Sequence, residues 1–409
     1  MTVASNRPAG DVGYFKGGSG FPTRFQGVKS GELPFFKVSD MNLPGNEIFM
    51  CRANNYISES VRKQLGATRI PAGAIIFAKV GAAVFLERKR ILTQDSCIDN
   101  NMAAYVVDTE QLDGRFAHYL LTDLRLSSLA ATTALPSLNS GQLRSISLRV
   151  PTSLDEQRRI AGALADADDL IELLGRQIAK KRSIKQGVMQ ELLTGRVRLP
   201  GYSEAWIEQP VSELLEFKNG LNKASQFFGH GTPIVNFMDV MRAPVITANR
   251  VKGLVSLSRD EISRFSARRG DMFFTRTSES VDEIGTAAVL VGDVRDAVFS
   301  GFVLRGRPIA PVNTTFLAYQ FQLPSVRRQV VATASYTTRA LTNGGSLGRV
   351  RVRVPSSDEQ AAIVAVLADT DVELAALERR LRTARAIKKG MMQQLLTGRT
   401  HLARKEAAS

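Results

Sequence analysis

Few residues of this chain have the types and spacing that catalytic chemistry needs. Three histidines (His118, His230 and His401) and two cysteines (Cys51 and Cys97) are scattered singly along the chain. A metal site or a nucleophilic site needs such side chains to recur at short, characteristic spacings, so neither is predicted. The sequence has no Walker A loop, no G-x-G-x-x-G after a strand, no H-E-x-x-H, no paired C-x-x-C and no Asn-Pro-Pro-aromatic stretch. No catalytic residue and no metal ligand is therefore predicted.

Two polar features have both a structural and a functional interpretation. Asp40 and Asp239 hold equivalent places in two stretches that resemble each other, PFFKVSDM and PIVNFMDV. A duplicated single carboxylate is typical of a turn or helix cap, and a general-acid pair is the alternative. The stretch GGSG at 17–20 predicts a glycine-rich turn, with phosphate binding as the alternative.

Length and charge narrow the class of protein. A chain of 409 residues predicts two to four domains. Its 54 Lys and Arg against 39 Asp and Glu give a net charge of +15, which favours a polyanionic partner such as nucleic acid over a merely soluble basic protein. No apolar run is long enough to span a membrane, the start does not resemble a signal peptide, and two cysteines favour a reducing cytoplasm.

An internal repeat organises the chain. Residues 155–196 align with residues 358–399 without a gap at an offset of 203, with 21 identities in 42 positions. Fainter similarity links the long stretches that precede the two copies, which hold most of the excess positive charge. The sequence therefore predicts a duplicated block and helix, with boundaries at 1–150 (first block), 151–199 (first helix), 200–354 (second block) and 355–409 (second helix and tail).

Each copy of the repeat predicts one long helix. Ser153 with Glu156, and Ser356 with Glu359, have the spacing of capping boxes, and Gly195 and Gly398 are predicted C-caps. The roughly 40 residues between cap and stop correspond to ~60 Å of helix. Apolar residues at steps of four and three predict a coiled-coil seam, with two unrelated surface helices as the alternative; the seam residues are Ile160, Leu164, Ala167, Ile171, Leu174 and Ile178 in the first copy and Ile363, Leu367, Thr370, Leu374, Leu377 and Leu381 in the second.

Charge predicts how the two helices pair. Acids outnumber bases six to two over 155–172 and six to none over 358–378, whereas bases outnumber acids seven to one over 173–198 and seven to none over 379–399. This order suits each helix dipole, and it also matches acidic halves with basic halves only in an antiparallel pair. The predicted fold class is mixed, α+β, with two pseudo-repeated globular domains separated by two long antiparallel coiled-coil helices.

The far end of each helix holds a second conserved pattern. Gly187 and Gly390 lie inside the helices, where Gly costs about 1 kcal/mol relative to Ala. Their retention predicts a close approach by another helix, either within the chain or from a partner subunit. The residues assigned to helix packing or subunit docking are Ile160, Leu164, Ile171, Leu174, Ile178, Gly187, Met189, Leu192, Ile363, Leu367, Leu374, Leu377, Leu381, Gly390, Met392 and Leu395.

These repeats give the chain its resemblance to a known family. The stretches VPTSLDEQRRIAGALADADDLI and VPSSDEQAAIVAVLADTDVEL, and the two endings KQGVMQELLTGR and KKGMMQQLLTGR, resemble the conserved helices of Type I restriction–modification specificity subunits. The stretch GSGFPTRFQG…GELPFFKVSDMNLPGN is similar to one type of target-recognition domain of that family. The resemblance spans nearly the whole chain.

The resemblance implies a function and a set of partners. Family members read a split, asymmetric site on double-stranded DNA with two target-recognition domains, and their two helices set the spacing. Two modification subunits dock on them and use S-adenosylmethionine to methylate adenine N6 after base flipping. A motor-nuclease restriction subunit completes the complex. The chain itself is then expected to be non-catalytic, to bind no cofactor and to need no membrane.

One stretch departs from the family pattern. The second block opens on SEAWIEQPVSELLEFKNG, the usual Trp-led entry strand, whereas the first block opens on DVGYFKGG. A shortened edge of the first domain, or a start recorded too far downstream, is therefore expected.

Groove recognition predicts which side chains contact DNA. Base edges are read by Arg, Lys, Asn and Gln on loops, while other basic residues hold phosphates. In the first block the candidates are Arg24, Gln26, Lys37, Asn42, Asn46, Arg52, Asn54 and Asn55 for bases, and Lys79, Arg88, Lys89 and Arg90 for phosphates. In the second block they are Asn219, Lys223, Asn236, Arg242, Asn249, Arg250, Lys252, Arg276 and Arg339.

Two functions from other classes remain open at this point. One is a non-catalytic coiled-coil scaffold with two protein-binding domains. The other is a stand-alone enzyme whose site has no recognisable motif. Two equivalent basic blocks favour the DNA-binding hypothesis over both.

Overall fold

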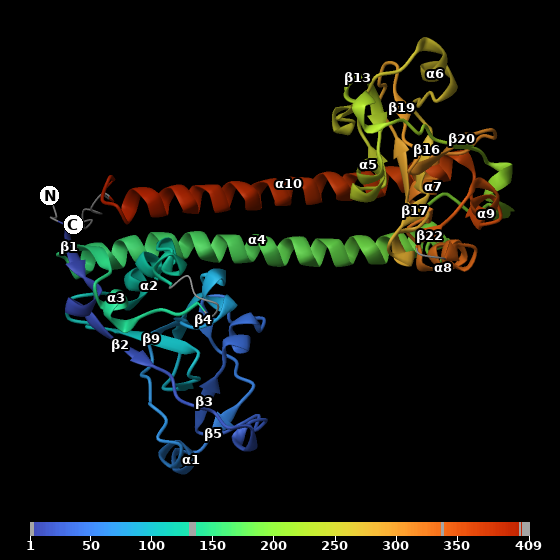
Figure 1. Cartoon of the computed structure of the whole chain (residues 1–409). Helices are drawn as coiled ribbons and strands as arrows, with labels where there is room; N and C mark the ends of the chain where they lie inside the picture. Colours follow the sequence, from blue (N-terminus) through green and yellow to red (C-terminus); the bar gives the residue numbers. More distant parts are fainter. Residues whose placement is uncertain (1–3, 131–135, 337–338, 401, 403–409) are drawn as a thin grey trace, which may run out of the picture. The chain divides into compact units, whose positions relative to one another are not determined.

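The chain forms two compact units that share two long helices. The computed structural model describes residues 4–130, 136–336, 339–400 and 402 (Figure 1). One unit contains Met1–Gly175 and Arg379–Ser409, and the other contains Arg176–Glu378. Helix α4 (Leu154–Thr194) and helix α10 (Ser357–Leu395) each contribute one half to each unit. The unit boundaries in the two helices, after 175 and after 378, differ by 203, the offset of the sequence repeat.

The domain of the first unit is built on three small sheets. A five-stranded sheet has the order β2–β9–β6–β7–β4, a three-stranded sheet has the order β5–β3–β8, and β1 pairs with β10. The strands are short; they are β1 (Ala4–Pro8), β2 (Gly13–Gly17), β3 (Leu33–Phe36), β4 (Phe49–Met50), β5 (Tyr56–Ile57), β6 (Ile75–Ala78), β7 (Lys89–Leu92), β8 (Cys97–Ile98), β9 (Met102–Val107) and β10 (Ser147–Pro151). The helices are α1 (Glu59–Gln64), α2 (Gly114–Asp123) and α3 (Ser140–Arg144).

The domain of the second unit repeats these sheets strand for strand. Its five-stranded sheet has the order β12–β20–β16–β18–β14, its three-stranded sheet has the order β15–β13–β19, and β11 pairs with β23. Its strands are β11 (Ile207–Pro210), β12 (Leu215–Asn219), β13 (Phe228–Val235), β14 (Val245–Ile246), β15 (Gly253–Val255), β16 (Met272–Thr275), β18 (Ala287–Leu290), β19 (Val298–Phe299), β20 (Val303–Pro308) and β23 (Arg351–Val354), with β17 (Thr277–Ser278), β21 (Ser335–Tyr336) and β22 (Ala340–Leu341) in a further sheet. Its helices are α5 (Phe237–Arg242), α6 (Arg259–Arg264), α7 (Thr314–Gln320), α8 (Pro324–Ala332) and α9 (Gly344–Gly348). The predicted duplication of a mixed α and β domain is therefore confirmed.

The expectation of a shortened edge in the first domain is wrong. Strand β1 pairs antiparallel with β10, and Ala4 lies opposite Pro151. In the second domain β11 pairs antiparallel with β23, and Ile207 lies opposite Val354, at the same offset of 203. Strand pairing uses backbone groups, so the entry strand forms without the Trp-led sequence of its counterpart.

The predicted helix ends are largely confirmed. The Ser153 hydroxyl accepts a hydrogen bond from the Glu156 amide at 3.4 Å, as an N-cap does. Gly195 and Gly398 end the helices with φ of +70° and +63°, the left-handed conformation of a glycine C-cap. At the second start, however, the Glu359 carboxylate does not form the predicted capping box. It is fully buried and instead accepts hydrogen bonds from the guanidinium of Arg198.

Within each unit the two helix segments run antiparallel. In the first unit, Lys388 of α10 donates to Asp168 of α4 at 2.5 Å. In the second unit, Arg182 of α4 donates to Glu378 of α10 at 2.5 Å, and Lys185, further along α4, pairs with Asp371, which is earlier in α10. Acidic segments thus meet basic segments, as the charge pattern predicts. None of the helices in the described ranges is long and apolar enough to cross a membrane.

Both helices complete the hydrophobic core of each domain. In the first unit the buried cluster contains Ile160 and Leu164 from the start of α4 and Leu395 and Leu396 from the end of α10. In the second unit the cluster contains the repeat equivalents of these four residues, which are Ile363, Leu367, Leu192 and Leu193. The endings KQGVMQELLTGR and KKGMMQQLLTGR are therefore core-forming segments, each inserted against one domain.

Because the helix ends are part of the hydrophobic cores, truncating a buried side chain there should destabilise a domain. Leu395→Ala removes a side chain that is 5% exposed, and we expect it to lower the free energy of unfolding of the first unit by about 2–5 kcal/mol. Urea unfolding with hydrogen exchange measures the loss and assigns it to residues 1–150. Ile387→Ala is the control, because Ile387 lies on the same helix, is 56% exposed and should change stability by less than about 0.5 kcal/mol. Equal effects of the two variants would contradict this core assignment.

Candidate nucleic-acid interface

The duplicated carboxylates are structural. Asp40 is fully buried and accepts a hydrogen bond from the Lys37 amide at 2.7 Å. Asp239 accepts one from the Asn236 amide at 2.9 Å. Each closes a capping box at the start of a short helix, so the cap interpretation is confirmed. Among the described residues, no three His, Cys, Asp or Glu side chains gather in a way that could hold a metal ion, and His401 lies outside those residues.

One loop arrangement recurs in both domains at the end of the first long strand. A Cβ atom at Gly18 would lie 1.8 Å from the Asp99 carbonyl oxygen, and one at Gly220 would lie 2.1 Å from that of Ser300. Only glycine allows backbones this close. The contact ties the strand end to the turns at 99–101 and 300–302, and parallel bridges join Ser19 to Asp99 and Leu221 to Ser300. The glycine-rich stretch at 17–20 is therefore part of a close backbone contact.

A basic side chain flanks this turn in both domains. The Lys79 amide donates to the Asn101 carbonyl at 2.8 Å, and the Arg276 amide donates to the Phe302 carbonyl at 3.0 Å. Lys79 and Arg276 each follow the equivalent strand, β6 or β16, by one residue. Both side chains are half-buried beside an exposed residue, Asn101 or Phe302. The fold thus brings two sequence-predicted DNA contacts to equivalent positions.

The second-domain turn also gathers residues that the sequence did not single out. Phe302 is 59% exposed and lies between two hollows of about 380 and 360 Å³. Arg339 lines the first hollow, and Asn222 and Lys223 line the second. Phe302 and Asn222 were missed because the matching turn of the first domain has Asn101 and Gly20 there. Alignment of VFSGFVL with CIDNNMA, at an offset of 201, would have revealed the turn.

Lys223 is partly neutralised within this group. Its ammonium lies 2.7 Å from the Glu261 carboxylate and 4.6 Å from the Phe227 ring centroid. The hydrogen bond from Lys223 lowers the pKa of Glu261, which keeps that carboxylate charged. Arg339 lies 3.4 Å from Glu279, and both of these side chains are exposed. An exposed ion pair such as that of Arg339 with Glu279 contributes little stability in water.

A second group of candidates lies on the loops of the first domain. Lys37 donates to the Gln26 side chain at 3.0 Å, and Gln26 donates to the Phe21 carbonyl at 2.7 Å. The Arg24 guanidinium lies 4.9 Å from the Phe25 ring centroid and is exposed. These bonds tie Lys37, which follows β3, to Gln26 on the loop before β3, while Arg24 extends into solvent.

Three candidates are buried and bonded inside the domain. The Asn46 amide group bonds four backbone groups, the carbonyls of Asp40 and Arg52 and the amides of Cys51 and Arg52. Asn55 accepts from the Gly27 amide at 2.8 Å. Lys89 is 2% exposed and pairs with Glu87 at 2.5 Å, and burial lowers the pKa of its ammonium. These side chains stabilise the conformation of the surrounding loops through hydrogen bonds inside the domain.

The other candidates lie on the domain surfaces. Asn42, Arg52, Asn219, Arg242, Asn249 and Lys252 are exposed, and Asn54, Arg88, Arg90, Asn236 and Arg250 are half-buried. Asn54 donates to Asp40 at 2.7 Å, and Arg88 donates to Asn42. Arg90 loses much of its hydration, and burial lowers the pKa of its guanidinium. Asn219 directly precedes Gly220 of the second-domain turn, whereas Arg242 and Arg250 lie beside the helix pair.

Comparison with known proteins finds one matching family model. The sequence model of the Type I restriction modification DNA specificity domain matches residues 5–181. The second domain, beyond that match, repeats the first strand for strand. Residues 5–181 are therefore similar to the DNA specificity domain of Type I restriction–modification systems.

Individual curated proteins show the same similarity. The putative type I restriction enzyme MjaX specificity subunit of Methanocaldococcus jannaschii is 22% identical over 199 residues, which are 47% of this chain and 46% of the relative. The EcoKI specificity subunit of Escherichia coli K12 is 24% identical over 302 residues, 69% of this chain and 64% of the relative. The aligned parts therefore span about half to just under two thirds of these curated relatives.

Solved structures share the fold. The crystal structure of a Type I restriction–modification S subunit from M. genitalium has a TM-score of 0.59 at 13% identity, and 96% of each chain is covered. A chain from a structural study of complex assembly and conformational transition in the type I restriction–modification system has a TM-score of 0.59 at 16% identity, covering 97% of this chain and 98% of that one.

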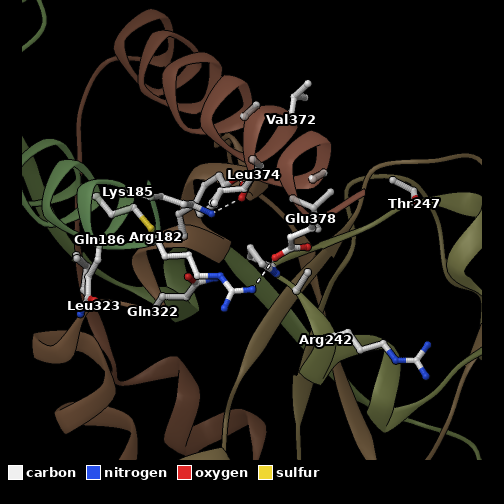
Figure 2. A pocket seen from close by; sticks show the side chains of 18 of the residues that line it. Arg182, Lys185, Gln186, Arg242, Thr247, Gln322, Leu323, Val372, Leu374 and Glu378 are labelled. Carbon is white, nitrogen blue, oxygen red and sulfur yellow. Dashed lines mark hydrogen bonds and ion pairs between the residues drawn. The ribbon is translucent and has the colours of Figure 1, made fainter. Parts of the chain in front are cut away.

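The second unit also holds a cavity larger than the two hollows beside Phe302. It measures about 960 Å³ and is lined by α4, by α10 and by the loops after α5 and α7 (Figure 2). Arg182 and Lys185 line it from α4, and Val372 and Glu378 line it from α10. The candidates Arg242 and Arg250 line this cavity and not the hollows around Phe302.

The residues assigned to the helix seam divide into three groups. Ile160, Leu164, Leu174, Ile178, Met189, Leu192, Ile363, Leu367, Leu374 and Leu395 are buried, and Ile171, Leu377, Leu381 and Met392 are half-buried. Gly187 and Gly390 differ, because a Cβ atom at either would have no described atom within 4 Å. The predicted close approach of another helix is therefore not made within the described chain.

The backbone contact at the turn gives a second prediction. In Gly220→Ala the new methyl would overlap the Ser300 carbonyl, so we expect the second domain to lose about 1–3 kcal/mol of stability. Denaturant unfolding measures the loss. The matched control is Gly162→Ala on the exposed face of α4, where nothing lies within 4 Å and a gain of up to about 1 kcal/mol is expected. A Gly220→Ala protein as stable as the wild type would contradict the contact.

Proposed function

We propose that this chain is the sequence-specific DNA-binding subunit of a Type I restriction–modification complex. Each domain reads one half of a bipartite, asymmetric site on double-stranded DNA. The observation that carries the proposal is the recurrence of one turn with a basic neighbour, Lys79 or Arg276, in two domains of the same topology. Two copies of one reading surface with different side chains suit two different half-sites.

In this proposal the helices hold and space the two readers. Residues 1–150 and 200–354 are the target-recognition domains, and residues 151–199 and 355–409 are the spacer segments. Support comes from the cores, because each domain closes on both helices and a change in helix length must then move it. The spacer thus sets the number of base pairs between the half-sites.

Two modification subunits dock on the helix pair. The open faces around Gly187 and Gly390 support this arrangement, because they are equivalent by the repeat and carry exposed apolar neighbours, Ile184 and Ile387. Those partners bind S-adenosylmethionine and methylate adenine N6, and a restriction subunit adds the motor and nuclease. This chain addresses the complex in the cytoplasm and performs no catalysis itself.

Contacts to DNA come from the two turns and the first-domain loop. Lys79, Arg276 and Arg339 approach phosphates or bases beside the exposed turn residues. Arg24, Gln26 and Lys37 extend the surface in the first domain, and Asn222 and Phe302 extend it in the second. Asn46, Asn55 and Lys89 are excluded from direct contact because their polar groups are bonded internally.

Genome-wide methylation tests the function directly. The chain is mixed with a modification subunit and S-adenosylmethionine, and methylated adenines are mapped across a genome. We expect one motif with two defined halves and a fixed spacer. Methylation without a consensus, or no methylation of any DNA by an assembled complex, would refute the proposal and favour a scaffold.

Single substitutions test the two turns separately. We expect Arg276→Ala to weaken recognition of one half-site by about 1–3 kcal/mol, or roughly 5- to 150-fold, and Lys79→Ala to affect only the other half-site. Methylation rates on DNA with single base changes in each half measure the effect. Arg295→Ala removes the same charge from a side chain that is 96% exposed in the second domain, and it is the control. Equal losses for Arg276→Ala and Arg295→Ala would remove the turn from the DNA surface.

A further inference from the structure

A tyrosine, a carboxylate and a lysine meet in each unit where the domain contacts the helix pair. In the first unit, the Tyr119 hydroxyl donates to Asp168 at 2.8 Å, and Lys388 donates to the other oxygen of Asp168 at 2.5 Å. The Lys388 ammonium also lies 5.3 Å from the Tyr119 ring centroid. The three groups form a closed triad with a hydrogen bond, an ion pair and a cation–π contact.

The second unit repeats the triad with the helices exchanged. The Tyr319 hydroxyl donates to Asp371 at 2.7 Å, Lys185 pairs with Asp371, and its ammonium lies 5.4 Å from the Tyr319 ring centroid. Asp371 and Lys388 follow Asp168 and Lys185 by 203 residues. In each triad the tyrosine comes from the domain (α2 or α7), the aspartate from one helix and the lysine from the other.

The triads are more sheltered than other helix pairs of the same kind. Both tyrosines are about 1% exposed, and burial raises the pKa of each phenol, which keeps it a hydrogen-bond donor. The Lys388 and Asp168 side chains are 19% and 12% exposed, and those of Lys185 and Asp371 are 14% and 40% exposed. By contrast, the ion pair of Lys181 with Glu373 is 34% and 58% exposed and includes no domain residue. Sheltered charge-assisted bonds are stronger and more directional than exposed ones.

Hydrogen bonds and ion pairs are directional, so they can fix the angle between a domain and the helix pair more narrowly than apolar packing does. The core contacts of Ile363 or Leu192 tolerate small slides, because dispersion forces have no preferred direction. A buried phenol bonded to a carboxylate that is also held by a lysine has one favourable geometry. A step of one base pair moves a half-site by about 3.4 Å and turns it by roughly 35°. A domain held at one angle therefore matches one spacing.

We propose that the two Tyr–Asp–Lys triads are positioning residues that hold each recognition domain at a fixed angle on the helix pair and so select the spacer length between the half-sites. This inference rests on the proposed function of the chain as a reader of bipartite DNA. It assigns spacing selectivity to Tyr119, Asp168, Lys388 and to Tyr319, Asp371, Lys185, none of which needs to touch DNA.

The test measures spacing separately from half-site sequence. The full chain is assembled with a modification subunit, and methylation rates are measured on DNA with both half-sites intact and spacers from two base pairs shorter to two longer. For the wild type we expect at least a tenfold preference for one spacer. For Lys185→Met we expect that preference to fall to threefold or less, with unchanged preference for bases within each half-site.

A matched control and a rescue accompany this variant. Lys181→Met breaks an ion pair one helical turn away that does not reach the domain, and it should keep the wild-type spacer preference. Tyr319→Phe, which removes only the hydroxyl, should relax spacing in the same direction as Lys185→Met. The double variant Lys185→Asp with Asp371→Lys restores opposite charges and should recover part of the preference.

The outcomes separate the triad from the function. An unchanged spacer preference in Lys185→Met and Tyr319→Phe overturns the positioning role while leaving the bipartite function intact. If Lys185→Met is inactive on every spacer, return of activity with a narrow spacer preference in the charge-swapped variant supports the role, and a folded but inactive swapped variant overturns it. A wild-type complex without a two-part motif overturns the proposed function, and the triad proposal with it.

Discussion

The structure depends on how each domain closes its hydrophobic core. Neither domain buries its apolar face with its own strands and short helices. Each uses the start of one long helix and the end of the other, through Ile160, Leu164, Leu395 and Leu396 in the first unit and the equivalent residues in the second. For the first domain this partner is distant in sequence, since Leu395 returns more than 200 residues after the domain ends. The helices are therefore part of both domains.

This constraint explains why the chain repeats itself. Each long helix needs an apolar start that packs against one domain and an apolar end that packs against the other. Because the chain is duplicated, a single sequence pattern provides both. The hydrogen bonds between the helices and the domains are duplicated in the same way. The buried side chains of Gln157 and Gln360 accept hydrogen bonds from the backbone amides of Asp113 and Asn313, the N-cap residues of α2 and α7, at 2.7 and 2.8 Å. Each junction is thus fixed by apolar burial and by bonds of defined direction.

Sequence patterns predict the duplication and the two long helices well, but they predict the arrangement of side chains on the domain surfaces poorly. The helices follow from a seven-residue apolar repeat, glycine stops and opposed charge, which are local signals. The residues that gather at the two turns could not be predicted in this way. The sequence offset between equivalent residues changes from 197 at Lys79 and Arg276 to 203 in the helices, so a simple alignment does not match them. The burial of Asn46 and Lys89 also escapes prediction, since their polar groups are satisfied by residues that only tertiary folding brings near. Strands of two to five residues carry too little alternation to reveal their pairing.

The most direct measurement changes the length of both helices together. Seven residues are inserted after Gly175 in α4 and seven after Glu378 in α10, which keeps the same helix faces toward each domain because a heptad is nearly two turns. The insertions add ~10 Å to each helix with little net rotation, so the methylated motif should keep both halves and have a longer spacer. An insertion in only one helix should prevent assembly of the pair. An unchanged spacer in the doubly lengthened protein would contradict the claim that the shared helices set the distance between the two readers.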